Sequence, residues 1–188
     1  IPVPPPLTAS LQEPSFSALD GNMEDVFHLV PFASTSLTDG RGAHLPWLQA
    51  TPDPITTATW RTWIEINLKK AEGMGIKEGD VVKVINGSGQ SIEALAYPHP
   101  GISPDVVSVP IGQGHTAGGR YSQGRGANVL SILETDKINS VGAMAWAATM
   151  VRIEKTGRWT RLPRFENTAP QLATDEKQHI IPLTSVDS

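Results

Sequence analysis

The 188-residue sequence contains no cysteine. This absence excludes disulfide bonds, thiolate zinc sites, a cysteine nucleophile and cysteine-ligated iron–sulfur clusters within the chain. Charged residues are also scarce, at 18% of the sequence, against about a quarter in an average domain. Lysine and arginine are scattered and the formal net charge is −4, so we expect no binding of nucleic acid.

Long hydrophobic runs are missing as well. No stretch approaches the ~18 apolar residues of a membrane helix, so we expect no direct membrane span. The longest apolar run, residues 141–151, includes Thr149 and is interpreted as core. No signal-peptide pattern is visible, and the first residue is Ile1 rather than methionine. We therefore interpret the chain as the last piece of a larger subunit.

Glycine and proline are abundant, with 17 and 16 copies. This excess predicts many turns and short strands rather than long helices. Residues 1–24 are rich in proline and lack periodicity, so we interpret them as an arm or linker. Residues 157–188 are polar and unpatterned and are interpreted as a C-terminal arm. Residues 25–156 are expected to form the folded domain.

Short apolar segments in this central part alternate with turn signals. Asn67 is suited to cap a short helix, and the sequence NGSG at residues 86–89 favours a hairpin turn. A long loop is expected at residues 32–59. The pattern predicts a closed, mainly β barrel with six strands and short helices. The strands are expected near residues 27–31, 63–66, 81–85, 91–97, 106–110 and 144–153.

The most unusual segment is residues 112–126, which we call the glycine loop because six of its 15 residues are glycine. A glycine-rich loop between a strand and a helix lets backbone N–H groups approach a phosphate, and Arg120 and Arg125 have the charge to neutralise a pyrophosphate. A solvent loop that needs positive φ angles explains the same glycines. The candidate cofactor-binding residues are Gly112, Gln113, Gly114, His115, Arg120 and Asn128.

The other candidates each have a structural alternative. The Asn128 amide suits a pterin or guanine edge, but it equally suits a helix N-cap. Asp39 and Arg41 are interpreted as an internal ion pair. Glu65 and Glu93 are expected to point to solvent, so no paired-carboxylate mechanism is predicted. The five histidines show no metal-ligand spacing, and no catalytic group is visible. Core or interface positions are expected for Trp47, Trp60 and Trp63.

The order of motifs resembles one family closely. The run WIEIN at residues 63–67 is followed by Ala71 and by GIKEGDVVKV at residues 75–84. The segment PGI at residues 100–102 then precedes the next strand, and GANVL at residues 126–130 follows the glycine loop. These signals resemble the C-terminal dinucleotide-binding domain of the molybdopterin oxidoreductases, the dimethyl sulfoxide reductase superfamily, over residues 27–153.

The resemblance implies a double-psi β-barrel that contacts a molybdopterin guanine dinucleotide. It also implies that the reacting metal is held by other domains, and that the chain is part of an oxidoreductase. The family contact at the position of Asn128 implies a role for that residue in cofactor binding.

One departure points to a subgroup. Many family members carry a Thr-Gly-Arg loop after the first strand, whereas here FAST occupies residues 32–35 and DGRGA follows at 39–43. Together with PWL at 46–48, GQGHT at 112–116 and GRY at 119–121, this version is similar to the molybdopterin-like part of the iron–sulfur subunit of alternative complex III.

That similarity implies iron–sulfur and membrane quinol-binding partners, and a peripheral location on the periplasmic face of a bacterial membrane complex. It leaves two functions open. The first is a cofactor-binding domain in a quinol-linked respiratory or photosynthetic complex. The second is a cofactor-free barrel that acts as an assembly module, because the metal cofactor is lost in that subgroup.

Overall fold

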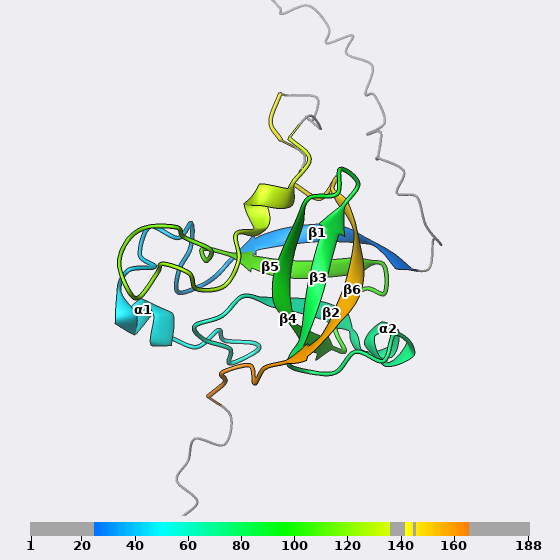
Figure 1. The fold of residues 1–188 in the computed structure, drawn as a ribbon, viewed down its shortest axis with the longest axis horizontal. Helices are drawn as coiled ribbons and strands as arrows, with labels where there is room; N and C mark the ends of the chain where they lie inside the picture. Colours follow the sequence, from blue (N-terminus) through cyan, green and yellow to red (C-terminus); the bar gives the residue numbers. More distant parts are fainter. Residues whose placement is uncertain (1–24, 136–141, 145, 166–188) are drawn as a thin grey trace, which may run out of the picture.

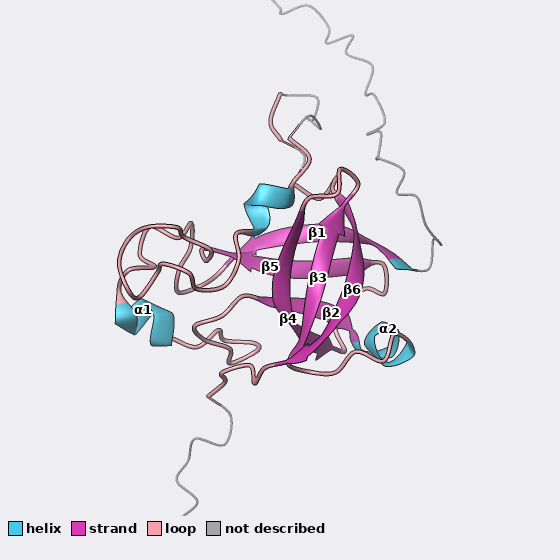
Figure 2. Ribbon diagram, viewed as in Figure 1, coloured by secondary structure: helices cyan, strands magenta, loops and turns pink. Residues whose placement is uncertain are grey.

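The computed structural model describes residues 25–135, 142–144 and 146–165. Six strands form one sheet that closes on itself (Figures 1 and 2). They are β1 (Val26–Ala33), β2 (Trp63–Asn67), β3 (Asp80–Asn86), β4 (Ser91–His99), β5 (Val106–Ile111) and β6 (Met150–Trp159). The short helices are α1 (Pro46–Ala50), α2 (Leu68–Gly73) and the 3₁₀ helix η2 (Val129–Ile132). The prediction of a mainly β, six-stranded barrel is confirmed, while the finer double-psi assignment stays a prediction.

The strands follow the order β1-β5-β2-β4-β3-β6 around the barrel. The pairs β1–β5 and β2–β4 are parallel, and the other neighbouring pairs are antiparallel. Ala33 at the end of β1 pairs with Ile111 at the end of β5. Because parallel strands end at the same edge, the segments that follow β1 and β5 leave the barrel together.

Every second side chain along the strands points into the barrel, and these side chains fill its interior. In β1, Phe27 and Leu29 are buried while their neighbours are half-exposed, as the two-residue repeat of a strand requires. Ile64 and Ile66 of β2 repeat this pattern from the next part of the sheet. The other strands add mainly valine and alanine, which fit the narrow interior of a six-stranded barrel. The strands contribute Phe27, Leu29, Ile64, Ile66, Val82, Val84, Ile92, Ala94, Ala96, Val107, Val109, Val151 and Ile153 to this core.

The local signals for α2 and for the β3–β4 turn are confirmed. The Asn67 side chain accepts hydrogen bonds from the N–H groups of Lys69 and Lys70, so it caps α2 as predicted. In the turn, Gly89 has a φ of 80° and its N–H donates to the Asn86 carbonyl. Among the described residues, no helix has the length and apolar character to cross a membrane.

The last strand was predicted too early in the chain. The expected strand at residues 144–153 is replaced by β6, which begins at Met150 and continues to Trp159. The apolar residues before it lack the two-residue repeat, whereas Val151 and Ile153 are buried beside exposed Arg152 and Glu154. Pairing of β6 with β3 therefore extends beyond residue 156, where the expected domain ended.

The chain also stays packed after β6. The Pro163 carbonyl accepts from the Thr59 N–H at 3.0 Å, and the Phe165 N–H donates to the Thr57 carbonyl at 3.1 Å. Residues 159–165 thus contact the barrel and the cover segment, although the sequence assigned them to an arm. The predicted arms at residues 1–24 and beyond residue 165 lie outside the described residues, and the domain division stays a prediction there.

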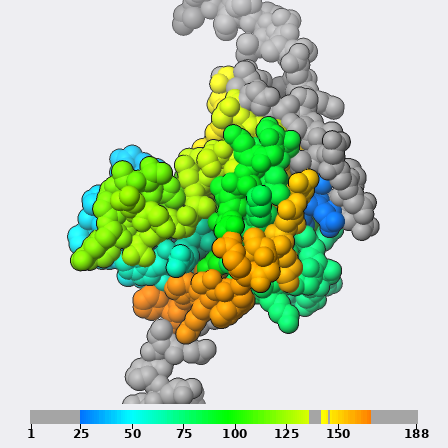
Figure 3. All heavy atoms as spheres, in the orientation of Figure 1, coloured from blue at the N-terminus to red at the C-terminus, as the bar shows by residue number. Residues whose placement is uncertain are grey.

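The segment between β1 and β2, residues 34–62, is called the cover segment below. It contains α1 and lies beside the glycine loop at the edge of the barrel where β1 and β5 end (Figure 1). In the space-filling view, the two segments form one lobe that projects from the barrel on the left (Figure 3). We call this lobe, which the cover segment and the glycine loop form together, the rim. It is where the candidate site residues meet.

Candidate functional site

The glycine loop is shaped by close backbone contacts. Gly114 has a φ of 83°, and a Cβ there would lie 2.1 Å from the backbone nitrogen of Asn128. Gly126 has a φ of 58°, and its Cβ would lie 2.4 Å from the hydroxyl oxygen of Thr62. Internal packing therefore explains these two glycines. Gly119 and Gly124 also have positive φ, but a Cβ at either would meet nothing within 4 Å.

Hydrogen bonds close the loop onto itself. The Gly114 N–H donates to the Arg125 carbonyl at 2.8 Å, and the Gly124 N–H donates to the His115 carbonyl at 3.0 Å. The Ser122 hydroxyl, which is buried, donates to the Ala117 carbonyl at 3.1 Å. The loop is consequently an ordered structure that fixes the positions of its arginines.

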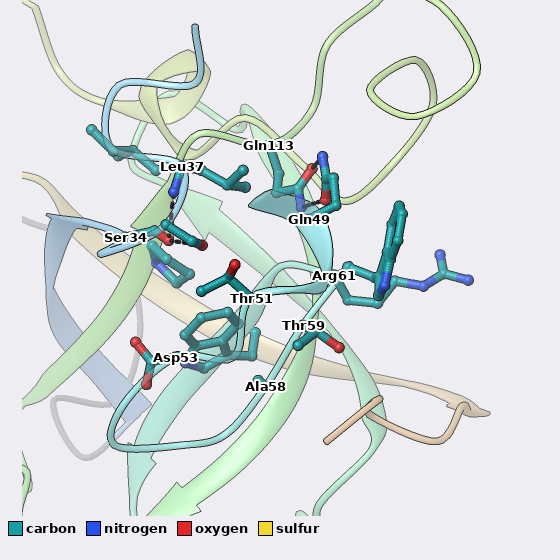
Figure 4. Close-up of a pocket in the computed structure, with 14 residues that line it drawn as sticks. Ser34, Leu37, Gln49, Thr51, Asp53, Ala58, Thr59, Arg61 and Gln113 are labelled. Carbon is teal, nitrogen blue, oxygen red and sulfur yellow. Dashed lines mark hydrogen bonds between the residues drawn. The ribbon is translucent and has the colours of Figure 1, made fainter. Parts of the chain in front are cut away.

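Two buried glutamines join the glycine loop to the cover segment. Gln113 Nε2 donates to Gln49 Oε1 at 2.7 Å, and Gln49 Nε2 donates to Gln113 Oε1 at 3.3 Å and to the Ala43 carbonyl at 2.8 Å. Figure 4 shows the two amides facing each other at one side of the pocket between the cover segment and β5. Such a reciprocal pair satisfies buried polar atoms and holds the two segments in register.

A second contact lies at the start of the glycine loop. A Cβ on Gly40 would come within 2.9 Å of His115 Nε2 and 3.1 Å of the Gly112 Cα, so the cover segment packs directly on the loop there. His115 Nε2 itself lies 3.2 Å from the Gly112 carbonyl oxygen. The imidazole is half-buried and stabilises the turn at residues 112–115.

The structure thus places all six sequence-predicted site residues on one continuous segment and gives each a local role. Gly112, Gln113, Gly114 and His115 form its packed beginning. Asn128 is exposed and its Oδ1 accepts from the Leu130 N–H at 3.1 Å, which caps η2. Arg120 is exposed and its Nη2 donates to the Tyr121 hydroxyl. Contact of these residues with a cofactor stays a prediction.

Stacking on Trp60 holds Arg125 at the rim. The Arg125 guanidinium carbon lies 4.7 Å from the centroid of the Trp60 ring, and the Tyr121 ring lies 6.3 Å from the same ring. The Arg120 guanidinium covers Tyr121 at 4.6 Å. Arg125 was noted in the sequence as a pyrophosphate candidate, but no sequence signal joined it to Trp60, 65 positions earlier. The stack depends on tertiary structure, because the antiparallel pairing of β2 with β5 brings the residues before β2 close to those that follow β5.

Trp60 has a φ of 60°, an uncommon backbone conformation for a bulky residue. Its N–H donates to the Gln49 carbonyl at 3.2 Å, which helps to hold it there. Such conformations cost of order 1–3 kcal/mol and cluster at functional sites. Trp63 is buried and Trp60 is half-buried, whereas Trp47 on α1 is 63% exposed, so for Trp47 only the interface position stays a prediction.

The predicted ion pair in the cover segment is confirmed. Arg41 Nη2 lies 2.6 Å from Asp39 Oδ2, and Arg41 Nε donates to both carboxylate oxygens. The hydrogen bonds from the Arg41 side chain lower the pKa of Asp39 from 3.8 to about 2. Both side chains are exposed, so the pair shapes the loop rather than forming a reactive site.

Glu65 differs from its prediction. It is half-buried rather than solvent-directed, and its carboxylate accepts from Trp63 Nε1 at 3.2 Å. Burial raises the pKa of Glu65. In the part of the chain that the structure describes, no three metal-ligand side chains gather into a potential metal site.

Comparison with protein families identifies the chain. The family model described as "Molydopterin dinucleotide binding domain" matches residues 47–145, a range that includes most of α1 and the whole glycine loop. The structure is also similar to acetylene hydratase from Pelobacter acetylenicus, with a TM-score of 0.54, 15% sequence identity, and coverage of 69% of this chain and 18% of that one. At this identity the likeness concerns the fold.

Curated relatives agree with the family model. The arsenate respiratory reductase molybdopterin-containing subunit of Chrysiogenes arsenatis is 34% identical over 140 residues, which is 69% of this chain. The menaquinone reductase, molybdopterin-binding-like subunit of Nitratidesulfovibrio vulgaris is 29% identical over 110 residues, or 54% of this chain. The matched region covers 16% of the length of each relative. The chain therefore belongs to the molybdopterin dinucleotide-binding domain family of the molybdoenzymes related to dimethyl sulfoxide reductase.

Proposed function

We propose that this chain holds one dinucleotide arm of a molybdopterin guanine dinucleotide while other parts of an oxidoreductase place the metal. The observation that carries the proposal is the family match across the rim, where the glycine loop and the cover segment lie together. When bound, such a cofactor supplies the redox chemistry. The residues of this chain supply binding and orientation.

The donors at the rim suit the polar groups of a dinucleotide. Arg120 and Arg125 carry guanidinium forks that match phosphate oxygens. Asn128 uses its Oδ1 to cap η2, and the same side chain has an amide N–H group that suits an acceptor on a base or pterin edge. The packed start of the glycine loop supports these groups, and it consists of Gly112, Gln113, Gly114 and His115. Within this proposal all six predicted residues belong to the binding surface.

The wider assembly is proposed from relatives. One relative is named a menaquinone reductase subunit and another a respiratory reductase subunit. These names support a place in a quinol-linked respiratory or photosynthetic complex, with an iron–sulfur protein and a membrane quinol-binding subunit as partners. We propose a peripheral position on the periplasmic face, as the similarity to alternative complex III implies.

The test is analysis of the protein purified with its natural partners. We expect stoichiometric molybdenum or tungsten by metal mass spectrometry, and guanosine monophosphate after acid hydrolysis. An Asn128→Asp variant keeps the oxygen that caps η2 but replaces the amide donor with a negative charge. Its cofactor content should fall several-fold.

Asn67→Asp is the matched control, because it makes the same change at the cap of α2, outside the rim. Its cofactor content should equal that of the wild type. A correctly folded wild-type protein without metal and nucleotide would contradict the proposal.

A cofactor-free assembly module is the second candidate function. The observation that favours it is the internal use of the candidate side chains, above all the Gln49–Gln113 pair, which is complete without a ligand. The name of one relative, "molybdopterin-binding-like", agrees with this reading for that relative. An intact complex without molybdenum, tungsten or guanine nucleotide would support this candidate, and bound metal would exclude it.

A further inference from the structure

A groove lies at the edge of the barrel opposite the rim. β2 runs from the cover segment to α2, and the antiparallel β5 runs from residues 100–105 to the glycine loop. The start of α2 and residues 100–105 therefore lie together at this far edge, and Figure 1 shows α2 on the side away from the lobe. The groove between them has a volume of about 480 Å³ and is lined by Asn67, Leu68, Lys69, Lys70, Pro100 and Pro104.

The two walls of the groove are fixed to each other by one side chain. The Asn67 Oδ1 accepts from the N–H groups of Lys69 and Lys70, which caps α2. The Asn67 Nδ2 donates to the Ile102 carbonyl at 2.7 Å, so the start of α2 is held against the loop before β5. A groove with fixed walls needs little reorganisation to accept a ligand, and this lowers the entropic cost of binding.

Apolar surface and positive charge occur together in this groove. Leu68 on α2 is 39% exposed, and Pro100 and Pro104 are exposed on the opposite wall. Proline has no backbone N–H, so these two residues offer apolar rings without that donor. Lys69 is exposed and forms no ion pair with any residue that the structure describes. The groove is therefore suited to a segment that carries both apolar and acidic side chains.

The N-terminal part of the chain joins the barrel next to this groove. β1 and β5 are parallel, so they start at the same edge. The His28 N–H donates to the Asp105 carbonyl at 2.8 Å, and Asp105 follows Pro104 of the groove wall. The described structure begins at Asp25, just before β1. Eight extended residues span up to roughly 25 Å, so residues 16–24 are long enough to reach the groove.

The residues before Asp25 have the composition that the groove requires. Residues 1–24 contain Glu13, Asp20 and Glu24 but neither lysine nor arginine. The segment FSALDGNME at residues 16–24 also carries large apolar side chains, namely Phe16, Leu19 and Met23. This segment therefore matches the groove in apolar character and is opposite to it in charge.

We propose that residues 16–24 of this chain bind in the groove between α2 and residues 100–105, with Leu19 against Leu68 and Asp20 near Lys69. The chain thereby covers the far edge of its own barrel. Burial of apolar surface supplies most of the binding free energy, whereas pairing of exposed charges adds little and is weakened by salt. The proposal is independent of cofactor binding, because the groove and the rim lie at opposite edges.

The lack of native cysteine allows a direct test by cross-linking. The full chain carries Leu19→Cys together with Leu68→Cys, and disulfide formation under a mild oxidant is followed by non-reducing electrophoresis and peptide mass spectrometry. An intramolecular disulfide should form at least tenfold faster than in the control pair, Leu19→Cys with Lys77→Cys. Lys77 is exposed between α2 and β3 but does not line the groove.

Further substitutions separate specific binding from mere proximity. Phe16→Ser, added to the Leu19→Cys and Leu68→Cys pair, should slow disulfide formation several-fold because it removes apolar contact. Lys69→Glu should also slow it, because it opposes Asp20. Lys83→Glu is the matched control and should leave the rate unchanged, since Lys83 is exposed on β3 outside the groove.

The outcomes distinguish the occupants of the groove. Equal rates in the Leu68 and Lys77 pairs would overturn the proposal, as would a rate that Phe16→Ser leaves unchanged or that Lys83→Glu slows as much as Lys69→Glu does. Disulfide-linked dimers in place of the intramolecular product would overturn it as well, since they would indicate a second copy of the chain in the groove. A fast intramolecular disulfide at Leu68 that Phe16→Ser slows would uphold it, whatever the metal content of the protein.

Discussion

The glycines of the rim divide into those that the neighbouring backbone requires and those that only the local turn requires. Gly114 and Gly119 have nearly the same φ, 83° and 85°, but only Gly114 has a backbone atom where a Cβ would be. The sequence shows both as loop glycines. The distinction between them depends on how close residue 128 approaches, which is a tertiary contact.

This contrast gives the first prediction. Gly114→Ala should destabilise the chain by roughly 3 kcal/mol, because the left-handed conformation costs an L-residue ~1–2 kcal/mol and the contact with the Asn128 nitrogen forces the backbone apart. Gly119→Ala, the control, should lose only the conformational cost of about 1–2 kcal/mol. Urea unfolding of the two variants measures the difference. Equal losses of unfolding free energy in the two variants would show that Gly114 does not lie close to the backbone of Asn128.

The Asp39–Arg41 pair gives a prediction about pH. The pKa of Asp39 is lowered to about 2 in the folded chain, below its ordinary value of 3.8. A carboxyl group with a depressed folded pKa stabilises the fold above its unfolded pKa, and this contribution disappears as the pH falls through the folded value. Carboxyl NMR titration should give a midpoint near 2 in the wild type and a higher midpoint in Arg41→Gln, which loses the guanidinium but keeps the backbone N–H that donates to Asp39. Identical midpoints would exclude the hydrogen-bonded pair in solution.

At the scale of elements, Asn67 has two functions that can be separated. Its Oδ1 caps α2, and its Nδ2 donates to the Ile102 carbonyl at 2.7 Å. Asn67→Ala removes both and should cost about 2 kcal/mol. Asn67→Asp keeps the cap and should cost about half as much. Thermal unfolding of the two variants tests this order, and a larger loss in Asn67→Asp would contradict it.

The sequence was informative where a signal is local. Asn67 before α2 and the NGSG turn before β4 were both predicted, because caps and hairpin turns depend on neighbouring residues. β6 was misplaced because the apolar residues before Met150 outweighed a strand whose outer face is rich in charge. The Trp60–Arg125 stack could not be predicted from the sequence, since it depends on which strands pair with one another.

At the scale of the whole molecule, the parallel pairing of β1 with β5 determines where the candidate site residues lie. It brings a cover segment and a glycine loop, far apart in sequence, to one rim of the barrel. The Gln49–Gln113 pair then joins them. The barrel supplies a rigid base, and the two segments supply the polar groups. This division explains why a chain without a visible catalytic group still has an ordered, positively charged rim.

The segment after β6 fastens the cover segment to the rest of the barrel. Arg164 Nε donates to the Thr56 carbonyl at 2.9 Å, and its Nη1 lies 2.8 Å from Glu78 Oε2. Its guanidinium also lies 4.9 Å from the centroid of the Tyr97 ring on β4. One side chain thus joins the cover segment, the turn before β3 and the outer face of β4.

Arg164→Ala should therefore cost about 2–3 kcal/mol, since it removes charged hydrogen bonds and a packed stem together. Arg161→Ala, an exposed arginine of the same segment, should stay within about 0.5 kcal/mol of the wild type. Urea unfolding of the full chain compares the two. If both variants match the wild type, residues 160–165 do not belong to the barrel unit, and the boundary predicted near residue 156 is the better one. If only Arg164→Ala is destabilised, the unit extends to residue 165, and the rim depends on the C-terminal segment for its position.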